Sequence, residues 1–110
     1  MTTNVNFTKD RVWAVESPLE FVEGSTVTLS CTYWSSVSSP AATVYRNKAN
    51  VTSTVMPSGT ATASGSVSTL KPLTALVGGA EYVVAVTGTV SGDVWIKKIE
   101  IICSKDEQAR

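Results

Sequence analysis

Side chains that carry most enzyme chemistry are scarce in this sequence. Histidine is absent from all 110 residues, which removes the commonest general base, the usual zinc ligand and every imidazole-dependent catalytic triad. The acidic residues stand mostly near predicted strand ends or the termini, and no two have a spacing that suggests a shared cleft. No Walker loop, dinucleotide-binding loop or calcium loop occurs. We therefore expect a protein that is not an enzyme and that needs no cofactor and no metal.

Two cysteines are the other candidates for chemistry. Cys31 and Cys103 lie far apart in different predicted strands, which excludes a zinc knuckle and a CxxC redox pair. Two interpretations stay open at this point. The side chains are either small buried apolar groups with free thiols or the two halves of one disulfide that closes a long loop.

Aromatic side chains are the candidates for binding. Exposed aromatic residues on the faces or loop ends of a sheet contact sugars and proteins, although such side chains more often pack into a core. We take Phe7, Trp13, Trp34 and Trp95 as the candidate partner-contact residues. Trp34 is the first candidate among them, because strand alternation places it on the side of Thr32, away from the core face.

The balance of positive and negative charge limits the classes of partner that we expect. Nine basic and nine acidic residues give a formal net charge of zero, so neither nucleic acid nor a membrane is an expected partner. Residues 1–4 lack the basic start and apolar run of a secretory signal, and no stretch has the length of a membrane span. We therefore expect synthesis in the cytoplasm without export, unless the chain is cut from a longer exported precursor.

Two-residue periodicity is the dominant pattern along the chain. In residues 26–34, Val27, Leu29, Cys31 and Tyr33 alternate with threonine and serine, as in a half-buried antiparallel strand. Residues 81–90 and 94–103 alternate in the same way around the turn residues 91–93, which predicts a β-hairpin. In its second strand Ile99, Ile101 and Cys103 share one face, opposite Lys98, Glu100 and Ile102.

Weaker strand candidates occupy residues 11–16, 19–23, 43–47, 51–56 and 67–70. Turn-forming residues separate them, notably in the runs 35–40, 47–50 and 56–59. With about seven short strands and no helical segment, the pattern predicts an all-β, two-sheet Greek-key sandwich. We expect an amino-terminal arm in residues 1–10, the sandwich in residues 11–104 and a charged tail in residues 105–110.

Two segments resemble immunoglobulin-like and fibronectin type III-like domains. Residues 76–82, which begin with Leu76 and end with Tyr82, resemble the tyrosine corner of those domains, and residues 83–86 their penultimate strand. Residues 23–31 resemble their second strand. The resemblance implies an immunoglobulin-like sandwich. One departure is that Val84 stands where the immunoglobulin pattern has its second cysteine, which here is Cys103 on the last strand.

The overall character of the chain is similar to that of small immunoglobulin-like virion proteins of tailed bacteriophages. The similarity comes from the Thr-, Ser- and Val-rich sandwich, the runs 44–47 and 50–54, and the closing strand 95–103 with its charged tail. It implies a decoration or accessory protein that docks on the major capsid protein or another virion protein. We expect the arm of residues 1–10 and one loop end to make that contact.

Two other hypotheses stay open. A carbohydrate- or cell-surface-binding module would stack Trp13, Trp34 or Trp95 on a sugar. An adhesin or pilus-like repeat from a longer secreted protein would join Cys31 to Cys103. A homo-oligomer is compatible with each of the three.

Overall fold

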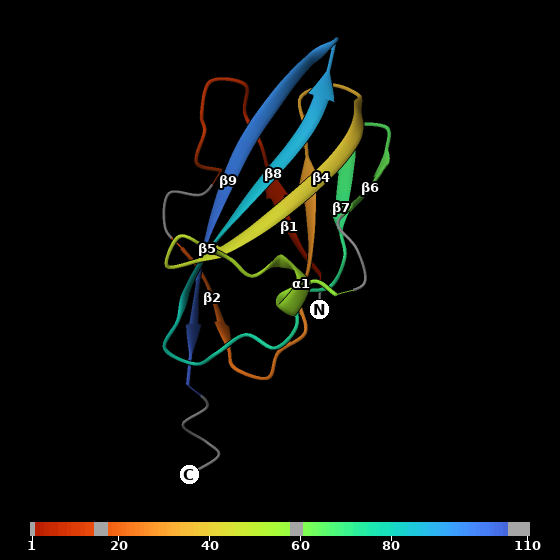
Figure 1. Cartoon of the computed structure of the whole chain (residues 1–110). Coiled ribbons are helices and arrows are strands. Elements are labelled where there is room, and N and C mark those ends of the chain that lie inside the picture. The colour runs from red at the N-terminus through yellow and green to blue at the C-terminus, as the bar shows by residue number, and fades with distance from the viewer. Residues whose placement is uncertain (1, 15–17, 58–60, 106–110) are drawn as a thin grey trace.

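The molecule is built from two β-sheets packed face to face. The computed structural model describes residues 2–14, 18–57 and 61–105, and within them nine strands and one short helix are present. Figure 1 shows β9, β8 and β4 side by side in one layer, with β1 and β7 in the layer behind. This arrangement confirms the β-sandwich that the two-residue periodicity predicts.

The first sheet has four strands in the order β1–β3–β7–β6. They are β1 (Thr2–Asn6), β3 (Thr28–Thr32), β7 (Val67–Leu70) and β6 (Ala61–Ser64). The second sheet has five strands in the order β2–β9–β8–β4–β5. They are β2 (Leu19–Val22), β9 (Asp93–Ser104), β8 (Glu81–Val90), β4 (Val37–Arg46) and β5 (Ala49–Asn50).

Both sheets are mixed. The pairs β3–β7, β6–β7, β4–β5, β4–β8 and β8–β9 are antiparallel, whereas β1 is parallel to β3 and β2 is parallel to β9. The long hairpin of β8 and β9 places β9 in the interior of its sheet, between β2 and β8. In the part of the chain that the structure describes, no helix is long and apolar enough to cross a membrane.

The core lies between the sheets and follows the predicted alternation. Val27, Leu29 and Cys31 have no exposed surface and Tyr33 is only 4% exposed. The inward sets of the other two long strands are buried as well: Tyr82, Val84, Val86 and Val90 on β8, and Ile99, Ile101 and Cys103 on β9. The hydroxyl oxygen of Tyr82 accepts a hydrogen bond of 2.9 Å from the backbone N–H of Val77.

The expected amino-terminal arm is a strand of the sandwich. Residues 2–6 form β1, and Val5 pairs with Cys31 across the parallel ladder. Val5 is 3% exposed and Phe7 is 4% exposed, because both side chains complete the core beside β3. Residues 2–7 are therefore part of the sandwich and do not hang free as a docking arm, and Met1 lies outside the described residues.

The prediction of a strand over residues 51–56 is also wrong, because a short helix, α1 (Thr52–Val55), occupies this segment. The side-chain oxygen of Asn50 accepts hydrogen bonds from the Thr52 N–H, at 3.0 Å, and from its hydroxyl, at 2.7 Å. These bonds start a helical turn. Val55 and Met56 are neighbours in sequence and are both buried. In a strand, one of these two side chains would point away from the core.

Some further segments differ from expectation, and others lie outside the described residues. Residues 37–40, predicted as turn, belong to β4, which contains an irregularity in pairing between Ser38 and Ala41. Strand β6 was not predicted, because its Ala, Thr and Ser residues carry no apolar alternation. In the strand candidate 11–16, Trp13 makes an isolated parallel bridge to Lys98, and residues 15 and 16 lie outside the described residues. Residues 58 and 59 of the predicted turn and residues 106–110 of the predicted tail also lie outside them.

Candidate functional site

Phe7 lies in the core. Its ring packs edge to face on the ring of Tyr33, with the centroids 5.0 Å apart and the planes at 87°. With 4% of its surface exposed it cannot reach a partner from the folded domain. The assignment of Phe7 as a contact residue is therefore not supported by its position.

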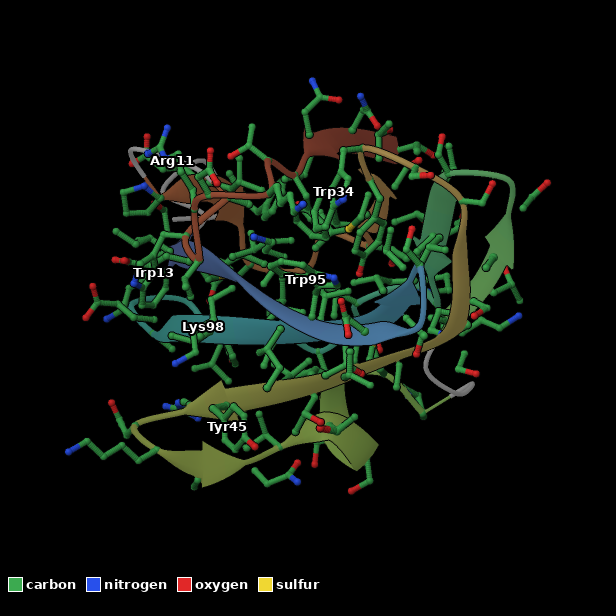
Figure 2. All side chains as sticks on the ribbon, turned by 90° about the horizontal axis from the view of Figure 1, so that it is seen from above. Arg11, Trp13, Trp34, Tyr45, Trp95 and Lys98 are labelled. Carbon is green, nitrogen blue, oxygen red and sulfur yellow. The ribbon has the colours of Figure 1, made fainter. Side chains whose placement is uncertain are left out.

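Trp34 and Trp95 pack against each other at one end of the sandwich. Their ring centroids are 5.0 Å apart and the planes lie at 86°, an edge-to-face pair. Both side chains are half-buried, and Figure 2 shows them together in the interior of the layered ribbon. Trp34 comes after the last residue of β3, so the alternation that assigns Thr32 to the outer face does not extend to it. Trp34 and Trp95 have a structural role here.

Trp13 lies on the outside of the five-stranded sheet and is 43% exposed. Backbone hydrogen bonds on either side of it hold it beside β9: Lys98 N–H to Val12 O at 2.8 Å, and Ala14 N–H to Lys98 O at 2.9 Å. The Nζ of Lys98 stands 5.6 Å from the centroid of the indole ring, a cation–π contact. Figure 2 shows Trp13 and Lys98 close together, with Tyr45 farther across the sheet.

A groove of about 460 Å³ opens between these residues on the outer sheet face. Its floor is the outward side of β8, where Val83 and Ala85 are half-buried. Because β8 lies between β9 and β4, the groove has one aromatic residue on each side. Trp13, Lys98 and Glu100 line the β9 side, and Tyr45, Asn47 and Lys48 line the β4–β5 side. Glu81 and Tyr82 complete the lining.

The β4–β5 side of the groove has unusual backbone geometry. Asn47 and Lys48 are the two residues between β4 and β5, and their φ angles are +51° and +67°. Two-residue hairpin loops favour this left-handed pair of conformations, which suits asparagine and glycine and costs a residue such as lysine about 1–2 kcal/mol. The turn thus presents Lys48 to the groove at a cost in stability.

The charged groups around the groove balance. Lys48 and Lys98 stand against Glu81 and Glu100, so the lining offers both hydrogen-bond donors and acceptors but no excess of either sign. Among the described residues no group of three or more His, Cys, Asp or Glu side chains is placed to hold a metal ion. The arrangement can bind an amphipathic ligand by stacking and hydrogen bonding.

The two cysteines are free thiols in the core. Burial raises the pKa of Cys31 to about 12, and burial followed by the nearby negative charge of Glu23 raises the pKa of Cys103. Burial also raises the pKa of Tyr33 to about 12, with a smaller contribution from Cys31. A protonated, inaccessible thiol is a poor nucleophile. The adhesin hypothesis, which needs a bridge between these cysteines, has no support in the folded domain.

Comparisons with protein-family models, with curated proteins and with solved structures found no match to this chain. The functional argument therefore rests on the groove and on the surfaces around it.

Sequence reasoning found one side of the groove and missed the other. It selected Trp13 and placed Lys98 and Glu100 on the outer face of the last strand. It did not select Tyr45, although this residue precedes the turn residues Asn47 and Lys48 in a predicted strand. An aromatic residue beside a tight turn is the signal that could have found it.

Proposed function

We propose that this protein is a non-enzymatic binding module whose groove between Trp13 and Tyr45 takes a neutral saccharide. The observation that supports this proposal is a pair of exposed aromatic side chains, 43% and 36% exposed, on opposite sides of one groove. Both rings can present an apolar face to a ligand while their polar atoms stay in contact with water. Of the three tryptophans proposed to stack on a sugar, only Trp13 lines this groove.

The chemistry of the lining favours a neutral, hydroxyl-rich ligand. A pyranose ring has an apolar face of C–H groups, which suits the rings of Trp13 and Tyr45 and the floor formed by Val83 and Ala85. Each sugar hydroxyl both donates and accepts hydrogen bonds, and the lining supplies carboxylates, ammonium groups and the amide of Asn47. Because two lysines and two glutamates balance, the lining gives a phosphate or sulfate no net electrostatic attraction. The groove volume also lies within the usual range of ligand pockets.

A saccharide panel with matched variants tests this function. Neutral and anionic oligosaccharides are titrated by calorimetry into the wild type, Trp13→Ala, Tyr45→Ala and Val22→Ala, the last being an exposed apolar residue on β2. We expect neutral sugars to bind the wild type and Val22→Ala equally, and to bind each aromatic variant at least about tenfold more weakly. Equal affinity for all four proteins, or binding of anionic sugars alone, would contradict the proposal.

We also propose that the protein is carried on a virion, as a decoration or accessory protein. The resemblance to small phage virion proteins suggests this location, and a specific surface supports it. Val94 is 70% exposed and Ile96 is 53% exposed, both on the outward side of β9 beside the β8–β9 turn. Apolar side chains this exposed suit burial against another protein. The docking surface then lies at the hairpin end instead of the amino terminus.

The virion proposal is tested on particles from which the protein has been removed. Wild type, Ile96→Lys and Thr62→Lys, the last on the exposed strand β6, are mixed with such particles and sedimented. We expect the wild type and Thr62→Lys to co-sediment and Ile96→Lys to stay in solution. Binding of Ile96→Lys at wild-type level would exclude the hairpin end, and absence of wild-type binding would exclude the virion role.

We infer that the sandwich is of the immunoglobulin-like Greek-key type. Strands β3, β7 and β6 in one sheet and β4, β8 and β9 in the other follow the order of the B, E, D and the C, F, G strands of that fold. The hydrogen bond between Val77 and Tyr82 supports the same assignment. The parallel pairs β1–β3 and β2–β9 depart from its antiparallel pattern. An experimental structure in which β4 does not pair with β8 would refute the inference.

A further inference from the structure

Lys97 is a lysine in an unusual position. It lies on the inward side of β9, between the half-buried Trp95 and the fully buried Ile99, and only 2% of its surface is exposed. Lysine is almost never buried to this extent unless its ammonium group has partners. Burial lowers its pKa, and the charge of Asp10 counteracts part of that effect.

The partners of this ammonium group come from one short stretch of chain. The Nζ of Lys97 donates hydrogen bonds to the carbonyl oxygens of Lys9, at 3.2 Å, and Arg11, at 2.6 Å. It also stands 5.2 Å from the ring centroid of Trp34 and 5.5 Å from that of Trp95. One buried cation thus joins residues 9 and 11 to the aromatic pair at this end of the sandwich.

Residues 8–14, which we call the strap, are tied to the sandwich along their length, and the Nζ of Lys9 also lies 6.0 Å from the ring centroid of Trp95. At the start, the N–H of Phe7 donates to Thr32 O at 2.8 Å. Lys97 holds the middle, and the backbone of Lys98 holds the end on both sides of Trp13. The side chains of residues 8–13 are exposed, so apart from these ties the strap has little burial of its own. In Figure 1 it is the red segment beside β9.

We propose that Lys97 is the positioning residue of the groove: by tying the carbonyls of Lys9 and Arg11 it holds the strap so that Trp13 stands across β8 from Tyr45. Lys97 contacts no ligand itself and acts from the inner face of β9. Its neighbour Lys98 acts from the outer face, through its backbone and through the contact of its Nζ with the indole ring. Lys97 and Lys98, which are adjacent on β9, therefore hold the strap from the inner and the outer face of the sheet. The ligand chemistry rests on the proposed function, whereas the tie itself does not.

The test replaces the ammonium group by an apolar group of similar shape, Lys97→Met. Because residues 9 and 11 are trypsin sites, the rate of cleavage there measures how often the strap opens. We expect cleavage at least about tenfold faster in Lys97→Met than in the wild type or in the control Lys71→Met, with the domain still folded by circular dichroism. Unchanged cleavage in a folded Lys97→Met would overturn the proposal.

The position of the Trp13 side chain is measured by NMR spectroscopy in the absence of a ligand. Its indole N–H signal in a nitrogen–proton correlation spectrum is assigned by its loss in Trp13→Phe. We expect this signal to shift in Lys97→Met towards the value of an exposed indole, and to stay in place in Lys71→Met. Faster cleavage with an unmoved Trp13 signal would show that the tie does not position the groove, which would also overturn the proposal.

A second variant covers the case in which Lys97→Met does not fold. Lys97→Gln keeps a polar donor at this position, but its amide is shorter and uncharged and cannot tie both carbonyl oxygens as the ammonium group does. We expect the same shift of the Trp13 signal and a loss of saccharide affinity of at least about tenfold. If the wild type binds no saccharide, the proposed function fails, and the cleavage and spectral measurements still decide the role of Lys97. An unmoved Trp13 signal in a folded Lys97→Gln variant would overturn the proposal.

Discussion

At the scale of single residues, the Asn47–Lys48 turn lines the groove and has a backbone conformation that lowers the stability of the domain. Both residues adopt left-handed backbone conformations, which asparagine tolerates better than lysine. The β8–β9 turn uses Ser91 and Gly92 with φ angles of +52° and +85°, so there glycine fills the second position. Lysine at the equivalent position of the groove turn is the less favourable choice for the backbone.

Replacing Lys48 by glycine separates these two roles. We expect Lys48→Gly to raise the free energy of unfolding by about 1 kcal/mol, because glycine adopts the left-handed conformation without strain. We also expect it to weaken saccharide binding, since one donor of the groove is lost. Urea denaturation and calorimetry measure the two effects.

The matched control is Ser91→Gly, which relieves a left-handed residue in the turn outside the groove lining. It should stabilise the domain with no change in saccharide affinity. A lower free energy of unfolding in Lys48→Gly would show that the turn is not strained by lysine.

At the scale of elements, the long alternating strands could be predicted and the short ones could not. Strands β3, β8 and β9 carry their inward residues at every second position over most of their length, so the pattern fixes both element and face. Strand β6 consists of small residues, and α1 is a single turn started by the side chain of Asn50. Neither element produces a periodic pattern in the sequence, because β6 forms through backbone pairing and α1 starts from one local hydrogen bond.

Strand β1 was taken for an arm because its apolar content is a single valine between polar residues. Its place in the sheet gives a direct prediction. We expect Val5→Asp to lower the free energy of unfolding by at least about 3 kcal/mol, because it buries a carboxylate without a partner. Thr2→Asp, at an exposed position of the same strand, should have little effect. The midpoints of urea denaturation measure the stability of both variants. If Val5→Asp were as stable as the wild type, the segment would be a free arm.

At the scale of the whole molecule, the sequence predicted the β-sandwich but not the groove. Trp13 and Tyr45 are far apart in the chain and line the same groove because β9 and β4 are the two neighbours of β8 in the sheet. That strand order depends on long-range pairing, which single-strand periodicity does not specify. The same limit applies to Lys97: its inward position on β9 could be inferred from the alternation, but its carbonyl partners in residues 9 and 11 could not.

Buried acidic groups make the whole domain sensitive to alkali. The folded-state pKa of Cys31 is about 12, above its ordinary value of 9.0, so the unfolded chain loses this proton first. The stability that this group contributes is therefore fully present below pH 9 and is lost between pH 9 and about pH 12, by on the order of 1 kcal/mol per pH unit. The raised pKa values of Tyr33 and Cys103 act in the same direction.

The variant Cys31→Ala tests this dependence. Burial lowers the pKa of Lys97, which acts in the opposite sense, so the thiol is isolated by comparing two proteins that share this lysine. We expect Cys31→Ala to cost about 1 kcal/mol at pH 7 and to lose stability less steeply above pH 9. Urea denaturation from pH 7 to pH 11 provides the two slopes, and parallel slopes would contradict the role of Cys31.

The parallel pairing of β2 with β9 has a consequence for synthesis. Strand β9 is synthesised after the other eight described strands, yet it lies between β2 and β8 in its sheet. Until it emerges, β2 has no strand to pair with and the outward edge of β8 has none either. A polypeptide released before residue 93 would therefore lack the strand that joins β2 to β8, and both strands would expose unpaired edges to aggregation.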